Sequence, residues 1–225
     1  MYTSSIVTHQ IEGREIFLHQ ISDFDKVLDD LVNKDPGHID VLDERIPYWM
    51  DLWPSALALA RYLIRHKELF FHKSIIEIGA GLALPSIAIA PFCKEITITD
   101  YLEDALKYAR ENCQLNQIRN AKFLHLDWRK MDDDKKYDIV LASDIAYEKR
   151  FFGEIPIAIN SLLADDGTCY FAEPGRIQSK KFMDEILPGH FHSKHLGEER
   201  IQLNKSNAQV NIFELKKIFK TSQSE

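Results

Sequence analysis

A strand that runs into a glycine turn and then into a helix constrains the fold of this chain more than any other feature. Residues 75–78 read as a short apolar strand around Glu77, Gly79-Ala-Gly81 follows directly, and Leu84 begins a helical pattern. Glycines at such a point allow the backbone to turn sharply and to approach a ligand closely. The motif therefore predicts a βα unit with a nucleotide-like ligand at the end of its strand.

The rhythm of strand and helix continues after this motif. Strands are predicted at residues 95–99, 121–126, 137–142 and 208–216, with one more at 168–173 after an Asp166-Gly167 turn. Helices are predicted at residues 102–115, 152–163 and 179–187. Helical patterns that alternate with short apolar strands are typical of βαβ units around a buried parallel sheet. The predicted fold class is therefore α/β.

The segment before the motif has a different character. Residues 5–19 alternate weakly around Glu12-Gly13, which predicts a hairpin, and Pro54 suits the first turn of a helix. A chain of 225 residues is long enough for one α/β domain with a substantial core. We predict a hairpin and helix extension over residues 1–47 and one main domain over residues 48–220.

Asp100 and the start of the following helix indicate which ligand is bound. Asp100 stands 21 positions after Gly79, close to the offset of about 20 residues at which an acidic side chain accepts hydrogen bonds from ribose hydroxyls. A dinucleotide site also favours a third glycine and free N–H groups for the pyrophosphate. This chain has Leu84 there, and Pro85 has no N–H to donate. The pattern disfavours a nicotinamide dehydrogenase and predicts a ligand with ribose but no phosphate, such as S-adenosylmethionine.

Two aromatic elements are further candidates for the cofactor site. Asp127-Trp128 follows the third predicted strand of the main domain, where the carboxylate can accept from an adenine amino group and the ring can pack on the base. Trp53 precedes the helix that begins at Pro54, and it can cover the cofactor. A buried tryptophan and an aromatic cluster before a helix are also ordinary core features, so both interpretations stay open here.

Asp144 and Tyr147 follow the fourth predicted strand of the main domain. The carboxyl ends of strands are where open α/β sheets bind ligands. An aspartate and a tyrosine three residues apart can hold an amine acceptor there, and the ring can face a cationic sulfonium. The alternative is an N-capping aspartate that starts the next helix beside a packed tyrosine.

Together these residues resemble the seven-strand protein lysine methyltransferases, also called the methyltransferase-like family 16. The resemblance covers residues 49–176, and its parts are Leu-Trp53-Pro-Ser-Ala-Leu-Ala-Leu-Ala-Arg-Tyr-Leu63, Ile76-Glu-Ile-Gly-Ala-Gly-Leu82, Asp127-Trp128 and Asp144-Ile-Ala-Tyr147. The last part resembles the family's D-x-x-Y element. The third glycine often seen in the family's first motif is Ala83 here. Glu173-Pro-Gly-Arg176 resembles the D-P-G-R element of members that methylate the electron-transfer flavoprotein β subunit.

The resemblance implies a Rossmann-like class I methyltransferase fold. This fold has a seven-stranded, mostly parallel sheet in the order 3-2-1-4-5-7-6, with strand 7 antiparallel and helices on both faces. It implies that residues 48–220 form an S-adenosylmethionine-dependent methyltransferase domain that methylates a lysine side chain of a protein. The implied cofactor-binding residues are Trp53, Glu77, Gly79, Gly81, Asp100, Asp127 and Trp128, and the implied catalytic or acceptor-positioning residues are Asp144 and Tyr147.

Other functions remain open alternatives. A small-molecule N-methyltransferase that acts on an amine or pyridine nitrogen uses the same fold and motifs. Adenine methylation of nucleic acid is disfavoured, because Asp144-Ile-Ala-Tyr147 lacks the prolines of a D-P-P-Y motif and the chain has a formal charge of −7. A cofactor-binding module without catalysis is the third alternative, and the presence of both Asp144 and Tyr147 argues against it.

Cysteines and histidines bear on location and metal content. Cys93, Cys113 and Cys169 are widely spaced and odd in number, which favours reduced thiols in a cytoplasmic protein. The first twenty residues have no apolar run typical of a signal peptide, and no stretch is long enough to span a membrane. His190, His192 and His195 lack a nearby cysteine or paired carboxylates, so no metal is predicted.

Overall fold

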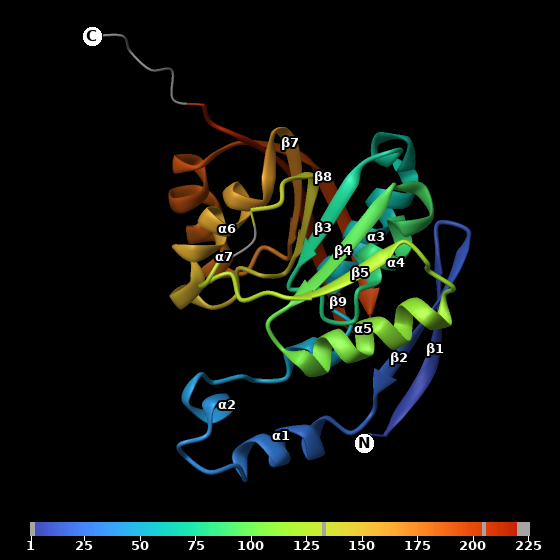
Figure 1. Ribbon diagram of the computed structural model, residues 1–225, viewed down its shortest axis with the longest axis vertical. Coiled ribbons are helices and arrows are strands. Elements are labelled where there is room, and N and C mark those ends of the chain that lie inside the picture. The colour runs from blue at the N-terminus through green and yellow to red at the C-terminus, as the bar shows by residue number, and fades with distance from the viewer. Residues whose placement is uncertain (1–2, 132–133, 204–205, 220–225) are drawn as a thin grey trace.

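The computed structural model describes residues 3–131, 134–203 and 206–219. Its centre is a seven-stranded sheet in the order β5-β4-β3-β6-β7-β9-β8 (Figure 1). The strands are β3 (Ser74–Ile78), β4 (Glu95–Asp100), β5 (Ala121–His125), β6 (Tyr137–Ser143), β7 (Leu163–Glu173), β8 (Phe191–Leu203) and β9 (Ser206–Lys217). Numbered from one to seven in chain order, they lie as 3-2-1-4-5-7-6, and β9 runs antiparallel to β7. The predicted topology is confirmed.

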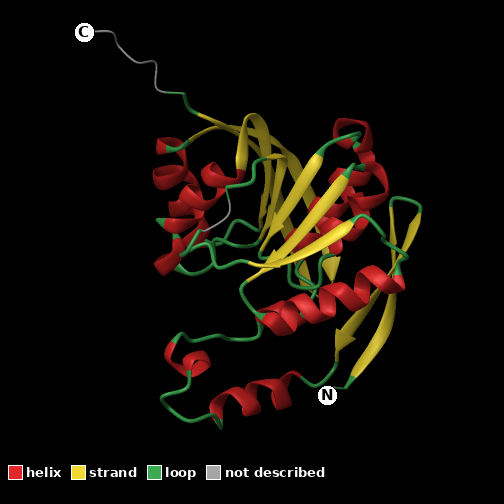
Figure 2. Ribbon diagram, viewed as in Figure 1, coloured by secondary structure: helices red, strands yellow, loops and turns green. Residues whose placement is uncertain are grey.

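Helices cover both faces of this sheet (Figure 2). The helices α3 (Pro54–Arg65), α4 (Leu84–Ile89) and α5 (Glu103–Leu115) contribute to one buried cluster, and α6 (Glu154–Leu162) contributes to the other. Neighbouring strand residues point to opposite faces, so Ile75 belongs to the first cluster and Ile76 to the second. The α/β fold class is confirmed. No helix in the described ranges is long and apolar enough to cross a membrane.

The site is positioned by the point where the strand order reverses. The strand β3 has β4 on one side and β6 on the other, and both pair with it in parallel. The carboxyl ends of these three strands therefore meet at one edge of the sheet. Ligands of open α/β sheets bind in the crevice at such a reversal.

The C-terminal strands depart from the sequence pattern in two places. The pattern predicts one late strand, whereas β8 and β9 form a long antiparallel pair. β8 is the edge strand of the sheet, and most of its residues are exposed or half-buried, so no apolar alternation marks it. In addition, β7 begins at Leu163, and the Asp166-Gly167 pair lies within it at a shift of the register against β6. The predicted turn at Asp166-Gly167 is thus an irregularity inside a longer strand.

The N-terminal extension contains the predicted hairpin, formed by β1 (Ser4–Ile11) and β2 (Arg14–Ile21), and then α1 (Phe24–Val32) and α2 (Ile39–Leu42). Asn112 of α5 and Asn116, which follows the last residue of that helix, pair with the outer edge of β2. The Asn116 side chain accepts from the Phe17 N–H at 3.0 Å and donates to the Phe17 carbonyl oxygen at 2.6 Å. The Asn112 side chain accepts from the His19 N–H at 2.7 Å. The hairpin is therefore docked by backbone-to-amide hydrogen bonds.

Candidate active site

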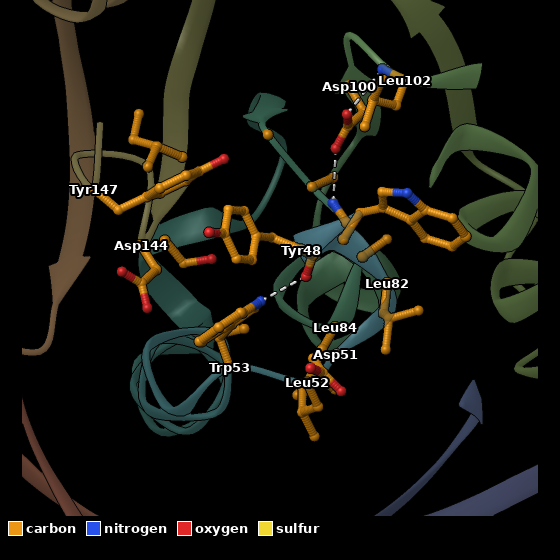
Figure 3. Close-up of a pocket in the computed structure, with 18 of the residues that line it drawn as sticks. Tyr48, Asp51, Leu52, Trp53, Leu82, Leu84, Asp100, Leu102, Asp144 and Tyr147 are labelled. Atoms are coloured by element: carbon orange, nitrogen blue, oxygen red, sulfur yellow. Dashed lines mark hydrogen bonds between the residues drawn. The ribbon is translucent and has the colours of Figure 1, made fainter. Parts of the chain in front are cut away.

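The loop after β3 presents backbone atoms to a cleft at the edge of the sheet (Figure 3). Gly79 and Gly81 have left-handed backbone angles, with φ of 62° and 52°. A Cβ atom at Gly79 would lie 3.0 Å from Ile145 Cγ2, and one at Gly81 would lie 3.3 Å from the Trp49 carbonyl oxygen. Glycine is therefore needed at both positions for conformation and for space. Ala83 adopts the same left-handed conformation, with φ of 62°, although it has a Cβ atom.

Asp100 closes one end of the cleft, and two backbone groups hold it there. The Gly81 N–H donates to Oδ2 and the Leu102 N–H donates to Oδ1, each at 3.0 Å. The side chain is buried, and this burial raises the pKa of Asp100 to about 6. An ionised carboxylate offers about four lone-pair sites. The Asp100 carboxylate therefore keeps the capacity to accept a further hydrogen bond from a ligand.

Asp127 and Trp128, which are adjacent in sequence, lie in different surroundings. Trp128 lines the cleft, and its ring packs edge-on against Phe151 with centroids 5.8 Å apart. Asp127 does not line the cleft, because its two oxygens accept from the Arg129 guanidinium at 2.7 Å. Arg129 also donates to both oxygens of Asp43, at 2.5 and 2.9 Å. Sequence reasoning missed this link, because Asp43 and Arg129 are 86 positions apart.

Asp144 lies on another side of the cleft, directly after β6. Its backbone is left-handed, with φ of 56°, and its N–H donates to the Ala172 carbonyl oxygen at 2.9 Å. Desolvation raises the pKa of the buried Asp144 carboxyl, although Arg176 acts in the opposite direction. The Arg176 guanidinium donates to both oxygens, with Nη2 3.0 Å from Oδ2. The helix-cap interpretation of Asp144 is wrong, because the next helical segment begins only at Lys149.

Tyr147 and three other residues separate the cleft from a second cavity. Tyr147 packs edge-on against Tyr48, with ring centroids 5.4 Å apart, and burial raises the pKa of its phenol. Tyr48, Trp53, Asp144 and Tyr147 line the cleft and also a neighbouring cavity of about 300 Å³. Arg176 and Gln178 complete the lining of that cavity. We call the four shared residues the boundary group.

Trp53 lines both the cleft and the second cavity, and a hydrogen bond holds its indole ring. It directly precedes α3, and its Nε1–H donates to the Tyr48 carbonyl oxygen at 2.7 Å. Its ring is half-buried, and the Arg176 guanidinium lies 5.6 Å from the ring centroid. Trp53 is thus neither a loose cover nor fully buried core.

Glu77 is buried on β3 and does not line the cleft. One of its oxygens accepts from the Ser86 N–H at 3.1 Å and from the Ser86 hydroxyl. Complete burial raises the pKa of Glu77 to about 8. The structure therefore places Glu77 where it links β3 to the first turn of α4.

Asp51 is a cleft residue that sequence reasoning missed. It lines the cleft well away from Asp100, beside Leu52 (Figure 3). Its carboxylate forms no side-chain hydrogen bond or ion pair with any residue in the described ranges, and partial burial raises its pKa. A single aspartate among aromatic residues has no spacing signal, so nothing in the sequence distinguishes it.

The three C-terminal histidines do not gather. His192 and His195 lie on β8, His190 precedes it, and His195 packs against Phe213 with ring centroids 5.1 Å apart. Across the described part of the chain, no three histidine, cysteine, aspartate or glutamate side chains are close enough to hold a metal ion.

Comparison with known proteins adds independent information. A family model described as lysine methyltransferase matches residues 48–188. Over 146 residues the chain is 32% identical to the histone-arginine methyltransferase METTL23 of Xenopus laevis, a match over 62% of this chain and 62% of that protein. Over 174 residues it is 30% identical to EEF1A lysine methyltransferase 3 of Xenopus tropicalis, a match over 73% of each. The chain thus spans less than two thirds of the first relative's length.

Solved structures agree in fold. The T. thermophilus 16S rRNA N2 G1207 methyltransferase RsmC, in complex with AdoMet and guanosine, superposes with a TM-score of 0.62 at 12% identity, over 97% of this chain and 52% of that one. A precorrin-6y C5,15-methyltransferase from Geobacter metallireducens gives 0.58 at 17% identity, over 72% and 89%. At such identities these likenesses show a Rossmann-like methyltransferase fold and no more. Because the family model matches more than half of the sequence, this chain belongs to the lysine methyltransferase family.

Proposed function

We propose that this chain is an S-adenosylmethionine-dependent N-methyltransferase that methylates a lysine side chain of a protein. The observation that carries the proposal is the pair of neighbouring spaces with a shared boundary group. Methyl transfer requires a donor and an acceptor that meet at one point. The cleft suits the donor, and the second cavity suits the acceptor.

The groups around the cleft fit S-adenosylmethionine chemically. The Asp100 carboxylate can accept hydrogen bonds from ribose hydroxyls, and the left-handed turn at Gly79 and Gly81 brings backbone atoms to the cleft. Trp128 lines the cleft, and its ring offers a face on which the adenine could pack. Asp51, away from the ribose end and without a partner among the described residues, suits the ammonium group of the methionine part.

The small volume of the cleft bears on how the cofactor can enter it. It encloses about 80 Å³, less than the ~300 Å³ at which small-molecule sites usually begin. Residues 46–53 supply much of its outer wall, including Trp49 and Asp51. We therefore expect the part of this wall that Trp49 and Asp51 form to move outward when the cofactor binds.

The boundary group would align the acceptor nitrogen. When bound, S-adenosylmethionine supplies a methyl group on a cationic sulfur for in-line displacement. A lysine ammonium has no lone pair, and its reference pKa is ~10.4, so desolvation between Tyr48 and Trp53 must favour the neutral amine. Asp144 and Tyr147 orient that amine, and alignment of this kind lowers barriers by ~7–11 kcal/mol in favourable cases.

An arginine acceptor is the second candidate. The METTL23 relatives are named histone-arginine methyltransferases, and Asp144 already binds a guanidinium, that of Arg176. For either side chain, the rim of the second cavity favours a protein over an enclosed small molecule, because Gln178 is exposed and Ile177 beside it is 92% exposed. We also propose a cytoplasmic location, supported by Cys93, Cys113 and Cys169, which are all free.

Radioactive labelling tests the proposal. The protein is incubated with radioactive S-adenosylmethionine and a lysate from cells grown under inhibition of methylation, and mass spectrometry then locates the labelled residue. Label on a lysine of a protein band supports the proposal, and label on an arginine supports the second candidate. Label only in the small-molecule fraction contradicts protein methylation. The Asp100→Ala variant is the control that should transfer no label.

A further inference from the structure

We infer that Arg176 occupies the acceptor-cation subsite of the second cavity while no acceptor is bound, and that the cationic side chain of the acceptor replaces it on Asp144. This inference rests on the proposed function. It adds the chemical class of the group that the acceptor site binds. This group is an alkyl cation with N–H donors, either an ammonium or a guanidinium.

The contacts of Arg176 are those expected of a bound ligand. Its guanidinium donates to both oxygens of Asp144 and lies over the ring of Trp53, 5.6 Å from the centroid. A carboxylate that accepts two hydrogen bonds, combined with an aromatic face, is a common way to bind an organic cation. In the described part of the chain, Arg176 is the only side chain in an ion pair with Asp144. Asp144 and Trp53 therefore form a complete subsite for a cation, and the Arg176 guanidinium of the same chain occupies it.

The Glu173-Pro-Gly-Arg176 motif explains how Arg176 reaches this position. Buried Glu173 accepts from the Gly175 N–H and from the Ser179 hydroxyl, each at 2.7 Å, and from the Asn211 side chain at 2.9 Å. Gly175 supplies a left-handed backbone, with φ of 71°. The glutamate thus fixes the turn, while the arginine side chain extends from it across the cavity.

Exchange is favoured by the unequal burial of the two partners. The Arg176 side chain is 36% exposed, whereas that of Asp144 is 7% exposed. Removing one member of a buried pair leaves an uncompensated charge, which is strongly unfavourable. When an acceptor cation takes the place of Arg176, Asp144 keeps a partner and the guanidinium moves into solvent. The subsite therefore binds the acceptor side chain in its cationic form, and a bound ammonium must then release a proton before the neutral amine can accept the methyl group.

The location of this subsite links exchange to methyl transfer. Asp144, Trp53 and the two boundary tyrosines border the cleft as well as the second cavity. An acceptor nitrogen on Asp144 would lie at the point where the two spaces meet. Arg176 itself lines the second cavity and does not line the cleft.

The experiment follows the Arg176 side chain directly. Protein labelled with ¹⁵N-arginine and saturated with S-adenosylhomocysteine is titrated with n-butylammonium and, separately, with n-butylguanidinium, which mimic lysine and arginine side chains. The Nε–H signal of Arg176 is assigned by its absence in Arg176→Lys. Probe affinity is also measured by tryptophan fluorescence, since Trp53 borders the cavity.

We expect the Arg176 signal to move toward that of a free arginine as the probe binds. Arg176→Ala should bind the probe roughly tenfold more tightly, because apparent affinity falls with the fraction of sites that are available. Asp144→Asn should bind neither probe. Lys181→Ala, which removes an exposed cation on α7 (Ile177–Lys181), should behave as the wild type. The probe that binds better indicates whether lysine or arginine is the acceptor.

A fixed Arg176 would give the opposite result. If folded Arg176→Ala binds the probes no more tightly than the wild type, and the Arg176 signal of the wild type does not move, the inference is wrong. Failure to bind S-adenosylhomocysteine would instead refute the proposed function. The titration of the free protein would then still decide the inference.

Discussion

Asp100 and Asp144 both line the candidate active site, but they are held in different ways. Asp100 accepts from the backbone N–H groups of Gly81 and Leu102, whereas the ion-pair partner of Asp144 is one long side chain, Arg176. Backbone donors stay in place as long as the loop is folded, while a side chain can rotate away. The comparison teaches that the Asp100 carboxylate is positioned before the cofactor binds, whereas the Asp144 carboxylate is positioned to exchange one partner for another.

Asp100→Ala should have the largest effect and tests the fixed side. Two charge-assisted hydrogen bonds to the ribose would be lost, each worth ~1.5–3 kcal/mol. The affinity for S-adenosylhomocysteine should therefore fall by at least roughly a hundredfold in calorimetry. Asp100→Asn, which keeps the shape, is the matched control for the folding of the loop. Unchanged affinity in a folded variant would remove Asp100 from the site.

Asp144→Asn and Tyr147→Phe test the exchangeable side. Misalignment of the acceptor should lower turnover by about 10²-fold, while the affinity for S-adenosylhomocysteine changes little because the Asp100 contacts remain. Turnover is measured on the acceptor that the labelling experiment finds. Wild-type turnover in both variants would show that these residues only pack the boundary between the two spaces.

Asp51→Asn sharpens the comparison by testing the amino-acid end of the cofactor separately from its ribose end. One hydrogen bond to a charged group would be weakened, so the affinity for S-adenosylhomocysteine should fall about tenfold. The affinity for methylthioadenosine should not change, because that ligand keeps the ribose and adenine but lacks the amino acid. An equal loss for both ligands would place Asp51 at the ribose instead.

Ala83→Gly should have the smallest effect. It tests the strain of the left-handed backbone at Ala83, in the loop between β3 and α4. A left-handed residue with a Cβ atom is strained by roughly 1–2 kcal/mol, and the greater freedom of glycine in the unfolded chain offsets ~0.4–1 kcal/mol of the relief. We expect a small rise in the free energy of unfolding, measured with denaturant. Ala83→Val should lower it clearly, and equal stability of both variants would contradict the strain.

The sequence was informative where the backbone determines the arrangement. The spacing of Gly79, Gly81 and Asp100 led to residues that meet at one cleft, because a strand, a turn and the next parallel strand leave little freedom. The strand order came from the resemblance to a known family. The residue pattern did not predict the edge strand β8, because most of its side chains are exposed or half-buried and show no apolar alternation.

The sequence was less informative where distant side chains determine the arrangement. Asp127 follows the third strand of the main domain, as expected. Its carboxylate binds Arg129, which also binds Asp43, and it does not line the cleft. The Arg176 motif was visible, yet nothing in the sequence joined it to Asp144. Such ion pairs depend on the tertiary fold, and no local pattern of residues encodes them.

The docking of the hairpin on α5 has a consequence for the newly made chain. Asn112 and Asn116 follow their partners on β2 by 93 and 99 residues. At synthesis rates of about 5–20 residues per second, the hairpin emerges roughly 5–20 s before the amides that complete its outer edge. During that interval the unpaired N–H and C=O groups of β2 form an open template for pairing with another chain. The two asparagines therefore end a period of aggregation risk, and their replacement should appear first as a lower yield of soluble protein during synthesis.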